Sequence, residues 1–143
     1  MLMAYILFSV LGQVVSETAK LEPCPDKPNC VSTQADPGDS EHYMPALSYS
    51  VDPKEVLAAV ESILLDMPRS KLKSKTDTRI HFTFRSRIFR FVDDVEVVID
   101  DANKELHFRS AARMGYSDIG VNRKRMTEFV TKLKEALPEA GFD

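Results

Sequence analysis

The sequence lacks the short motifs that would assign a reaction to it. It contains no glycine-rich phosphate loop, no internal repeat, no low-complexity tract and no coiled-coil heptad pattern. It has only two cysteines and no flanking histidine, so it cannot complete the tetrahedral shell of a structural zinc ion. We therefore predict no metal and no cofactor, and we favour a role other than catalysis.

A strong net charge is also absent. Lys and Arg number 19 and Asp and Glu 22, for a net charge of −3. The charge is uneven: residues 1–68 carry three basic and ten acidic side chains (−7), and residues 69–143 carry 16 and 12 (+4). Mild acidity argues against nucleic-acid binding, whereas one basic face can still accept a carboxylate or phosphate. The predicted partner is an unknown protein or a small anionic ligand.

No apolar run is long enough to span a bilayer comfortably, which takes roughly 20 residues. Residues 1–15 are almost wholly apolar or small and uncharged, and Val14-Val15-Ser16 has the spacing that signal peptidases accept. We interpret residues 1–16 as a secretory signal, although no Lys or Arg precedes the apolar run. The alternative is an uncleaved anchor that holds the protein near a membrane. The expected location is the periplasm, the exterior or an organelle lumen.

Residues 17–45 form a polar arm rich in Pro, Asp, Ser and Gly, without helical or strand periodicity. Cys24 and Cys30 lie within it, and in an exported protein this even count at short spacing favours a disulfide. The arm is either an extended segment lying over the domain or a solvated leader.

Residues 46–138 are predicted to form one α+β domain. A helix is expected from the Asp52 cap and Pro53 to Pro68, because apolar residues recur there at three- and four-residue intervals. A second helix is expected from an Asn122 cap to Pro138.

Alternating apolar and polar residues predict strands near 46–51, 80–85, 94–100 and 105–111, with 69–75 as a weak edge strand. Residues 86–93 disturb this alternation and suggest a bulge or a short turn. Phe89 and Phe91 within them are most simply core residues. The resulting fold is two-layered: an antiparallel sheet of four to five strands packed by two helices, in the order strand, helix, meander, helix.

Three segments, residues 24–32, 85–96 and 109–125, resemble the hallmark segments of domain-of-unknown-function family 1499. They are CPDKPNCVS, RSRIFRFVDDVE and RSAARMGYSDIGVNRKR. The resemblance extends from Cys24 to Leu137. It implies a domain that often follows a signal or membrane segment, and it supplies no catalytic residue.

The candidate site is the stretch from His107 to Arg125, which is expected to form a strand, a polar turn and the start of a basic helix. Cations in the first turn of a helix are unfavourable, so either an anion or nearby carboxylates must compensate. The candidates for binding an anion or partner are Arg109, Arg113, Tyr116, Ser117, Asn122, Arg123 and Arg125. We hypothesise that Arg113 and Arg123 face one another across the turn. The alternative is an internal clasp, in which Asp93, Asp94, Glu96 or Asp118 pairs with the arginines.

The sequence thus favours a small exported binding or assembly module with an arginine-rich, anion-accepting face. Two other roles remain open. The protein could bind an apolar or lipid molecule between sheet and helices, in a site lined by Phe82, Phe84, Phe89, Phe91 and Phe108. A hydrolase-type set can be written from Ser110 or Ser117 with His107 and Asp118, but triads are recognised by geometry. We interpret His42, His81 and His107 as surface residues.

Overall fold

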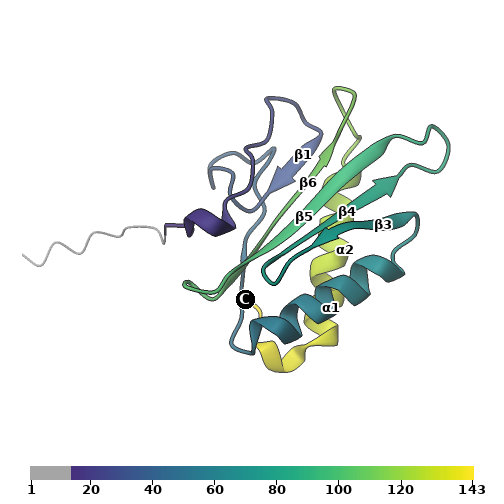
Figure 1. Ribbon diagram of the computed structural model, residues 1–143. Coiled ribbons are helices and arrows are strands. Elements are labelled where there is room, and N and C mark those ends of the chain that lie inside the picture. Colours follow the sequence, from purple (N-terminus) through teal and green to yellow (C-terminus); the bar gives the residue numbers. More distant parts are fainter. Residues whose placement is uncertain (1–13) are drawn as a thin grey trace, which may run out of the picture.

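The protein folds into two layers, with both α-helices on one face of an antiparallel sheet (Figure 1). The computed structural model describes residues 14–143, so nearly all of the predicted signal lies outside the described residues. The elements are η1 (Glu17–Ala19), β1 (Cys30–Ser32), β2 (Leu47–Ser48), α1 (Pro53–Asp66), β3 (Ser70–Lys75), β4 (Arg79–Arg85), β5 (Val92–Asp100), β6 (Glu105–Ala112), α2 (Val121–Ala136) and η2 (Pro138–Ala140). The α+β class is confirmed, and the sheet has six strands, slightly more than expected.

The sheet is ordered β1-β6-β5-β4-β3, and β2 pairs with the same edge of β6 as β1 does. Strand β5 lies at the centre and is paired along its whole length, from Val92 opposite Arg85 to Asp100 opposite Glu105. Strand β1 comes from the polar arm, with Cys30 opposite Ala111. The arm therefore contributes a strand to the sheet, which accounts for part of the excess over the prediction.

The core lies between the helices and the sheet. Helix α1 begins as predicted, because the Asp52 side chain accepts a hydrogen bond from the Lys54 amide at 2.8 Å and Pro53 occupies the first helical position. Phe108 of β6 meets Phe129 of α2 edge to face, with ring centroids 6.2 Å apart. The largest fully buried side chains are Phe82, Phe108, Phe129, Leu64, Ile80, Leu106, Met126, Leu133, Val56, Val60, Val95 and Val97.

Helix α2 begins earlier than its predicted Asn122 cap. Gly120 is the N-cap residue and has a positive φ of 77°, a conformation that glycine adopts without steric cost. The capping carboxylate belongs to Asp118, which accepts a hydrogen bond from the Asn122 amide at 3.0 Å. Asn122 is therefore a buried residue of the first turn, and its prediction as the cap was wrong.

The prediction that Phe89 and Phe91 belong to the core was also wrong. Residues 86–91 form a tight loop closed by two hydrogen bonds, from the Ser86 amide to the Phe91 carbonyl at 2.9 Å and from the Phe91 amide to Ser86 Oγ at 2.8 Å. Because this loop lies beyond the end of the sheet, neither α1 nor α2 covers it, and Phe89 is 73% exposed. The two rings stack on each other instead, with centroids 5.6 Å apart.

The sheet face away from the helices is partly covered by the start of the described chain (Figure 1). Both the amide and the hydroxyl of Ser16 donate to the buried carboxylate of Asp100, at 3.1 and 2.7 Å. Arg79 of β4 donates to the Lys20 carbonyl at 2.8 Å. Within residues 14–143, no helix has both the length and the apolar character needed to cross a membrane.

Candidate functional site

Arg125 lies in a nearly closed polar cluster on the helix side of the sheet. Its guanidinium contacts the Asp93 carboxylate at 2.8 Å and the Asn122 side-chain oxygen at 2.7 Å. Ser110 donates to the same Asn122 oxygen at 2.6 Å, and the guanidinium also lies over the ring of Phe84, 4.6 Å from its centroid. These contacts join α2 to β4, β5 and β6. They match the predicted clasp for this arginine.

Arg113 has its partner on the opposite face of the sheet. Successive strand residues point to opposite faces, so Asp94 lies on the other side from Asp93. Arg113 donates to Asp94 through two nitrogens, at 2.7 and 2.9 Å, and His81 Nε2 lies 2.7 Å from the same carboxylate. The Arg113 hydrogen bond is the main cause of the lowered pKa of Asp94, with His81 contributing and burial opposing.

Arg123 and Arg109 bind backbone carbonyls of the polar arm. One Arg123 nitrogen lies 3.1 to 3.3 Å from three carbonyl oxygens between residues 40 and 43. Arg109 donates to the Pro23 carbonyl at 3.3 Å. Both side chains therefore attach the arm to the domain.

The polar turn before α2 is organised around Asp118. Its carboxylate accepts hydrogen bonds from the Gly120 amide at 2.8 Å and from the amide and side-chain nitrogens of Asn122 at 3.0 and 2.7 Å. This negative group at the helix N-terminus offsets the cations in the first turn. Ser117 Oγ accepts from the backbone two residues later, and Tyr116 is exposed.

The four arginines of the predicted site thus have four separate sets of partners within the chain. Arg113 lies in the loop after β6 and Arg123 in α2, and the two contact different groups, so they do not converge on one ligand position. Asp93 and Asp94 pair with Arg125 and Arg113, as the clasp alternative proposes. Asp118 instead binds the Gly120 and Asn122 nitrogens, and Glu96 pairs with Arg79, which is not one of the four. The contacts in residues 14–143 describe an internal network at this turn.

His42 and His107 are buried, at 5% and 3% exposure, so the interpretation of these two as surface residues was wrong. The reason is the arm, which folds over His107 and encloses His42 between its own residues Asp39 and Lys27. Thr33 of the arm lies 2.9 Å from His107 Nδ1, and burial lowers the pKa of His107. Only His81 is partly exposed, beside Asp94.

The hydrolase-type set does not assemble. Ser110 lies on the helix side of β6 and donates to Asn122, whereas His107 lies on the other face and contacts Thr33. Asp118 is occupied as the helix cap. The apolar set is likewise divided, because Phe82, Phe84 and Phe108 are in the core while Phe89 and Phe91 are outside it.

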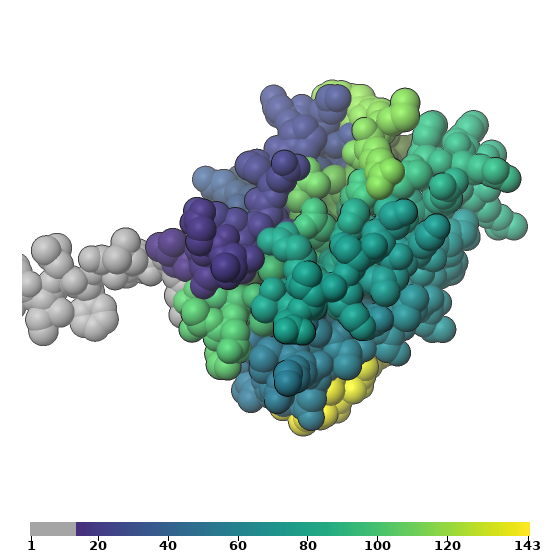
Figure 2. Space-filling view, in the orientation of Figure 1, coloured from purple at the N-terminus to yellow at the C-terminus, as the bar shows by residue number. Residues whose placement is uncertain are grey.

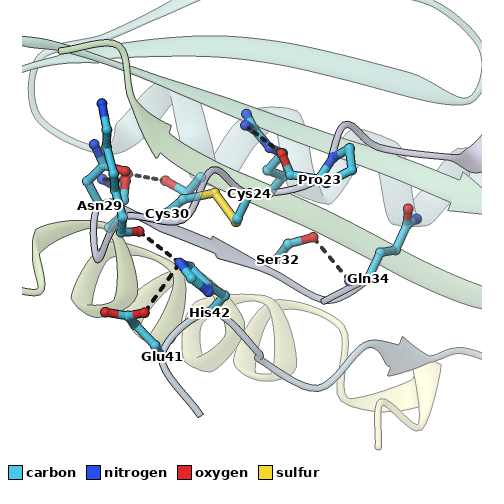
Figure 3. Close-up of a disulfide and its surroundings, with 12 residues drawn as sticks. Pro23, Cys24, Asn29, Cys30, Ser32, Gln34, Glu41 and His42 are labelled. Carbon is cyan, nitrogen blue, oxygen red and sulfur yellow. Dashed lines mark hydrogen bonds and ion pairs between the residues drawn. A yellow bond between two sulfur atoms is a disulfide. The ribbon is translucent and has the colours of Figure 1, made fainter. Parts of the chain in front are cut away.

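The predicted disulfide is present, with a Cys24–Cys30 sulfur separation of 2.04 Å (Figure 3). The loop that it closes is held by His42, whose Nε2 donates to the Lys27 carbonyl at 2.8 Å while Nδ1 contacts Asp39 at 2.7 Å. The pKa of His42 is raised overall: burial alone would lower it, but the contacts with Asp39, the Lys27 carbonyl and Glu41 outweigh burial.

Asp39, Glu41 and His42 offer three donor atoms within 4.8 Å of one another, a spacing that could hold a metal ion. Both ring nitrogens of His42 are already hydrogen-bonded, and Asp39 is one of the partners. The group therefore serves as a hydrogen-bonded clamp on the disulfide loop.

A different surface has the character of a binding site. The loop between β4 and β5 and the loop between β6 and α2 leave the sheet at the same end, where β4 and β6 end and β5 begins (Figure 1). In the space-filling view the two segments appear in shades of green at the upper right of the molecule (Figure 2). We call this surface the arginine–apolar end and define it as residues 69–71, 85–91 and 113–124. Nine large apolar side chains are exposed in residues 14–143, and seven of them lie here: Ile88, Phe89, Phe91, Met114, Tyr116, Ile119 and Val121. Monomeric proteins rarely expose such a concentration unless it is used for binding.

A hollow of about 380 Å³ opens at this end beside the 86–91 loop. We call it the basic hollow. No carboxylate lines it, and five of its eight lining side chains are cationic. The lining residues are Arg69, Ser70, Lys71, Thr83, Arg85, Ser86, Arg87 and Arg90. Among residues 14–143, none of the five cations forms an ion pair with a carboxylate.

Backbone strain is concentrated at the same end. Four non-glycine residues have positive φ within the described part of the chain, and three of them are Arg69 (60°), Arg90 (53°) and Ile119 (56°). This conformation costs about 1 kcal/mol or more for such residues, and strain of this kind clusters at binding and active sites. Sequence reasoning missed this site because Arg69 and Arg85 meet only through the β3–β4 pairing. The run Arg87-Ile88-Phe89-Arg90-Phe91 was the local signal available.

A protein-family model described as "Protein of unknown function (DUF1499)" matches residues 20–133. The match covers β1 to most of α2, including the disulfide loop, the clasp and both projecting loops. The chain therefore belongs to the DUF1499 family, as the three sequence segments predicted. A search of curated proteins found no match to the chain.

Proposed function

We propose that this protein is an exported, non-catalytic binding module that accepts an anionic group at the basic hollow. The observation that carries the proposal is the lining of that hollow, with five cationic side chains and no carboxylate. Like charges gathered at one place repel each other, and a bound anion relieves that repulsion. Guanidinium groups also present paired donors that match phosphate and carboxylate oxygens.

The proposal keeps the anion-accepting face inferred from the sequence but assigns it to other arginines. Arg113, Arg123 and Arg125 are engaged within the chain, whereas Arg85, Arg87 and Arg90 make no side-chain hydrogen bond or ion pair to residues 14–143. Unengaged side chains can bind a ligand without first breaking an internal contact. Serine and threonine hydroxyls in the same hollow add neutral donors.

Export is the second part of the proposal. It is supported by the Cys24–Cys30 disulfide, since such bonds persist in oxidising compartments, and by the apolar run at residues 1–15. The test is fractionation of cells that produce the full chain, with mass spectrometry of the Cys24–Cys30 peptide. Recovery of the protein in the reducing cytosol with free thiols would contradict this part.

Anion binding is tested by calorimetric titration and thermal shift with inorganic phosphate and glycerol 3-phosphate. We expect saturable stabilisation of the wild type and its loss in the double variant Arg85→Gln/Arg87→Gln. The matched control is Lys54→Gln/Lys134→Gln, which changes net charge equally with two exposed lysines that form no ion pair among residues 14–143. Equal responses in the two double variants, or no response in the wild type, would refute the site.

A further inference from the structure

The basic hollow and the exposed apolar side chains lie at the same end of the sheet. The five-residue run 87–91 supplies both kinds of side chain: two arginines line the hollow, and Ile88, Phe89 and Phe91 project beside it. A second hollow of about 300 Å³ shares Arg69 and Arg85 with the first and extends to Val121 and Lys124 of α2. Glu128 is the one carboxylate that lines this second hollow. Basic side chains therefore extend from the 86–91 loop to the exposed Val121 at the start of α2.

We infer that the arginine–apolar end docks on a lipid bilayer that contains anionic lipids. A headgroup phosphate occupies the basic hollow, and the apolar side chains of the two loops enter the interfacial region. This inference rests on the proposed function, because it names the source of the anion accepted at the same site.

The shape of the surface favours a bilayer over a folded protein partner. The apolar side chains are on the tips of two projecting loops, and the most exposed of them, Ile119 and Ile88, are 94% and 79% accessible. Projecting tips enter a deformable interface readily, whereas a folded partner would need a separate apolar pocket for each loop. Tyr116 adds an amphipathic ring of the kind enriched where membranes meet water.

The charge of the surface selects an anionic bilayer. Arg69, Lys71, Arg85, Arg87 and Arg90 lack carboxylate partners in residues 14–143, and clusters of four to eight basic residues are typical of surfaces that bind anionic lipids. Arginine alternates with apolar residues along 87–91, so its long side chain can reach a phosphate while its neighbours enter the apolar region.

The docking surface is separate from the start of the described chain. Val14 and Ser16 bind Asn103 and Asp100 at the β5–β6 turn, which is the opposite end of β5 from the 86–91 loop. Strand β5 has nine residues, a span of roughly 30 Å at about 3.3 Å per residue. Substitutions in the docking surface therefore leave the contacts of Val14 and Ser16 in place, and they can be tested in the full chain.

The chain contains no tryptophan, so one introduced residue reports on its own surroundings. The variants are Phe89→Trp and Met114→Trp, one in each loop, with Leu65→Trp on α1 as the control at an exposed apolar position outside this surface. Each is titrated with vesicles of phosphatidylcholine alone and of phosphatidylcholine with phosphatidylglycerol. We expect a blue shift and quenching by brominated acyl chains for the two loop reporters, only with the anionic vesicles, and neither change for Leu65→Trp.

A second arm tests the basic hollow by vesicle co-sedimentation. Arg85→Gln/Arg87→Gln should reduce partitioning into anionic vesicles by about tenfold or more, whereas Lys54→Gln/Lys134→Gln should leave it within about twofold. Loop reporters that respond no more than Leu65→Trp, or equal binding to neutral and anionic vesicles, would overturn the inference.

The two proposals fail differently. If glycerol 3-phosphate stabilises the wild type through Arg85 and Arg87 but the loop reporters remain water-exposed with vesicles, the anion site stands and the bilayer is refuted as its source. If Arg85→Gln/Arg87→Gln changes neither the binding of soluble phosphate nor the binding of vesicles, both proposals are refuted. Loop reporters whose emission shifts with soluble poly-glutamate and not with anionic vesicles would also overturn the bilayer inference.

Discussion

Replacing Arg125 by methionine should destabilise the protein strongly, because it removes one half of a nearly buried ion pair. The side chains of Arg125 and Asp93 are 11% and 12% exposed, and their closest atoms are 2.8 Å apart. Without the guanidinium, the Asp93 carboxylate loses its only ion-pair partner among residues 14–143. The Asn122 oxygen also loses one of its two donors.

Breaking a buried pair by removing one partner typically costs 3–5 kcal/mol, because an uncompensated charge stays behind. Lost packing over Phe84 adds to this cost, since the guanidinium lies 4.6 Å from the ring centroid. The slight exposure of the ion pair lowers this cost, so we expect Arg125→Met to reduce the free energy of unfolding by about 3 kcal/mol. For a chain of this length, that corresponds to a fall in melting temperature of about 10 °C.

The assay is equilibrium urea unfolding followed by circular dichroism, with the disulfide kept oxidised. The comparison includes Asp93→Leu, the double variant Asp93→Leu/Arg125→Met, and the exposed neighbour Lys124→Met as a control. The double variant should be more stable than either single variant, because no unpaired charge remains. The control should change stability by about 0.5 kcal/mol at most.

A loss below about 1 kcal/mol for Arg125→Met would show that the clasp does not stabilise the fold. Strict additivity of the two single variants would show that Arg125 and Asp93 are not coupled. Either result would refute the interpretation of these contacts as an internal clasp and return Arg125 to the candidates for ligand binding.

Three further stability predictions follow from the arm and the turn. Replacing Cys24 and Cys30 with serine opens a seven-residue loop, which should cost about 2 kcal/mol by loop-closure entropy; no loss in urea unfolding would contradict this. The pKa of His42 is raised in the folded state, so His42 stabilises the fold fully below about pH 6.5, and this stabilisation is lost as pH rises through the folded-state pKa. The pKa of Asp39 is lowered, so Asp39 stabilises the fold above about pH 4, and this stabilisation is lost as pH falls through its folded-state pKa. The stability difference between wild type and His42→Gln should therefore be largest near pH 5 to 6, and a difference that is flat from pH 4 to 9 would refute the clamp. Asp118→Ala removes the cap of α2 and should cost about 1 kcal/mol, with hydrogen exchange increased in the first turn; unchanged exchange would show that the cap is dispensable.

Local chemistry was enough to predict much of the fold. The Asp52 and Pro53 signals start α1 because capping depends on residues adjacent in sequence. Alternating apolar and polar residues along 94–100 and 105–111 predict two strands, each with one buried face and one more exposed face. The structure has β5 and β6 at these positions as an antiparallel pair. The cysteine spacing predicted the disulfide, and the three quoted segments predicted the family.

The candidate site could not be predicted in the same way, because its parts come together only through distant pairings. Asp93 and Asp94 are neighbours in sequence, yet the strand sends one to Arg125 and the other to Arg113 on opposite faces. Phe89 resembles a core residue by composition, but its loop extends beyond the sheet, where no other part of residues 14–143 buries it. Burial depends on which elements lie above a residue.

The sequence by itself therefore determined the helices, the alternating strands, the disulfide and the presence of competing carboxylates and arginines near the polar turn. The tertiary structure decided which arginines the chain uses internally and which it leaves without partners at the arginine–apolar end. The physical reason is range: caps, periodicity and short loops act over a few residues. Ion pairing and exposure depend on the β3–β4 and β1–β6 pairings, which bring Arg69 to Arg85 and the arm to β6.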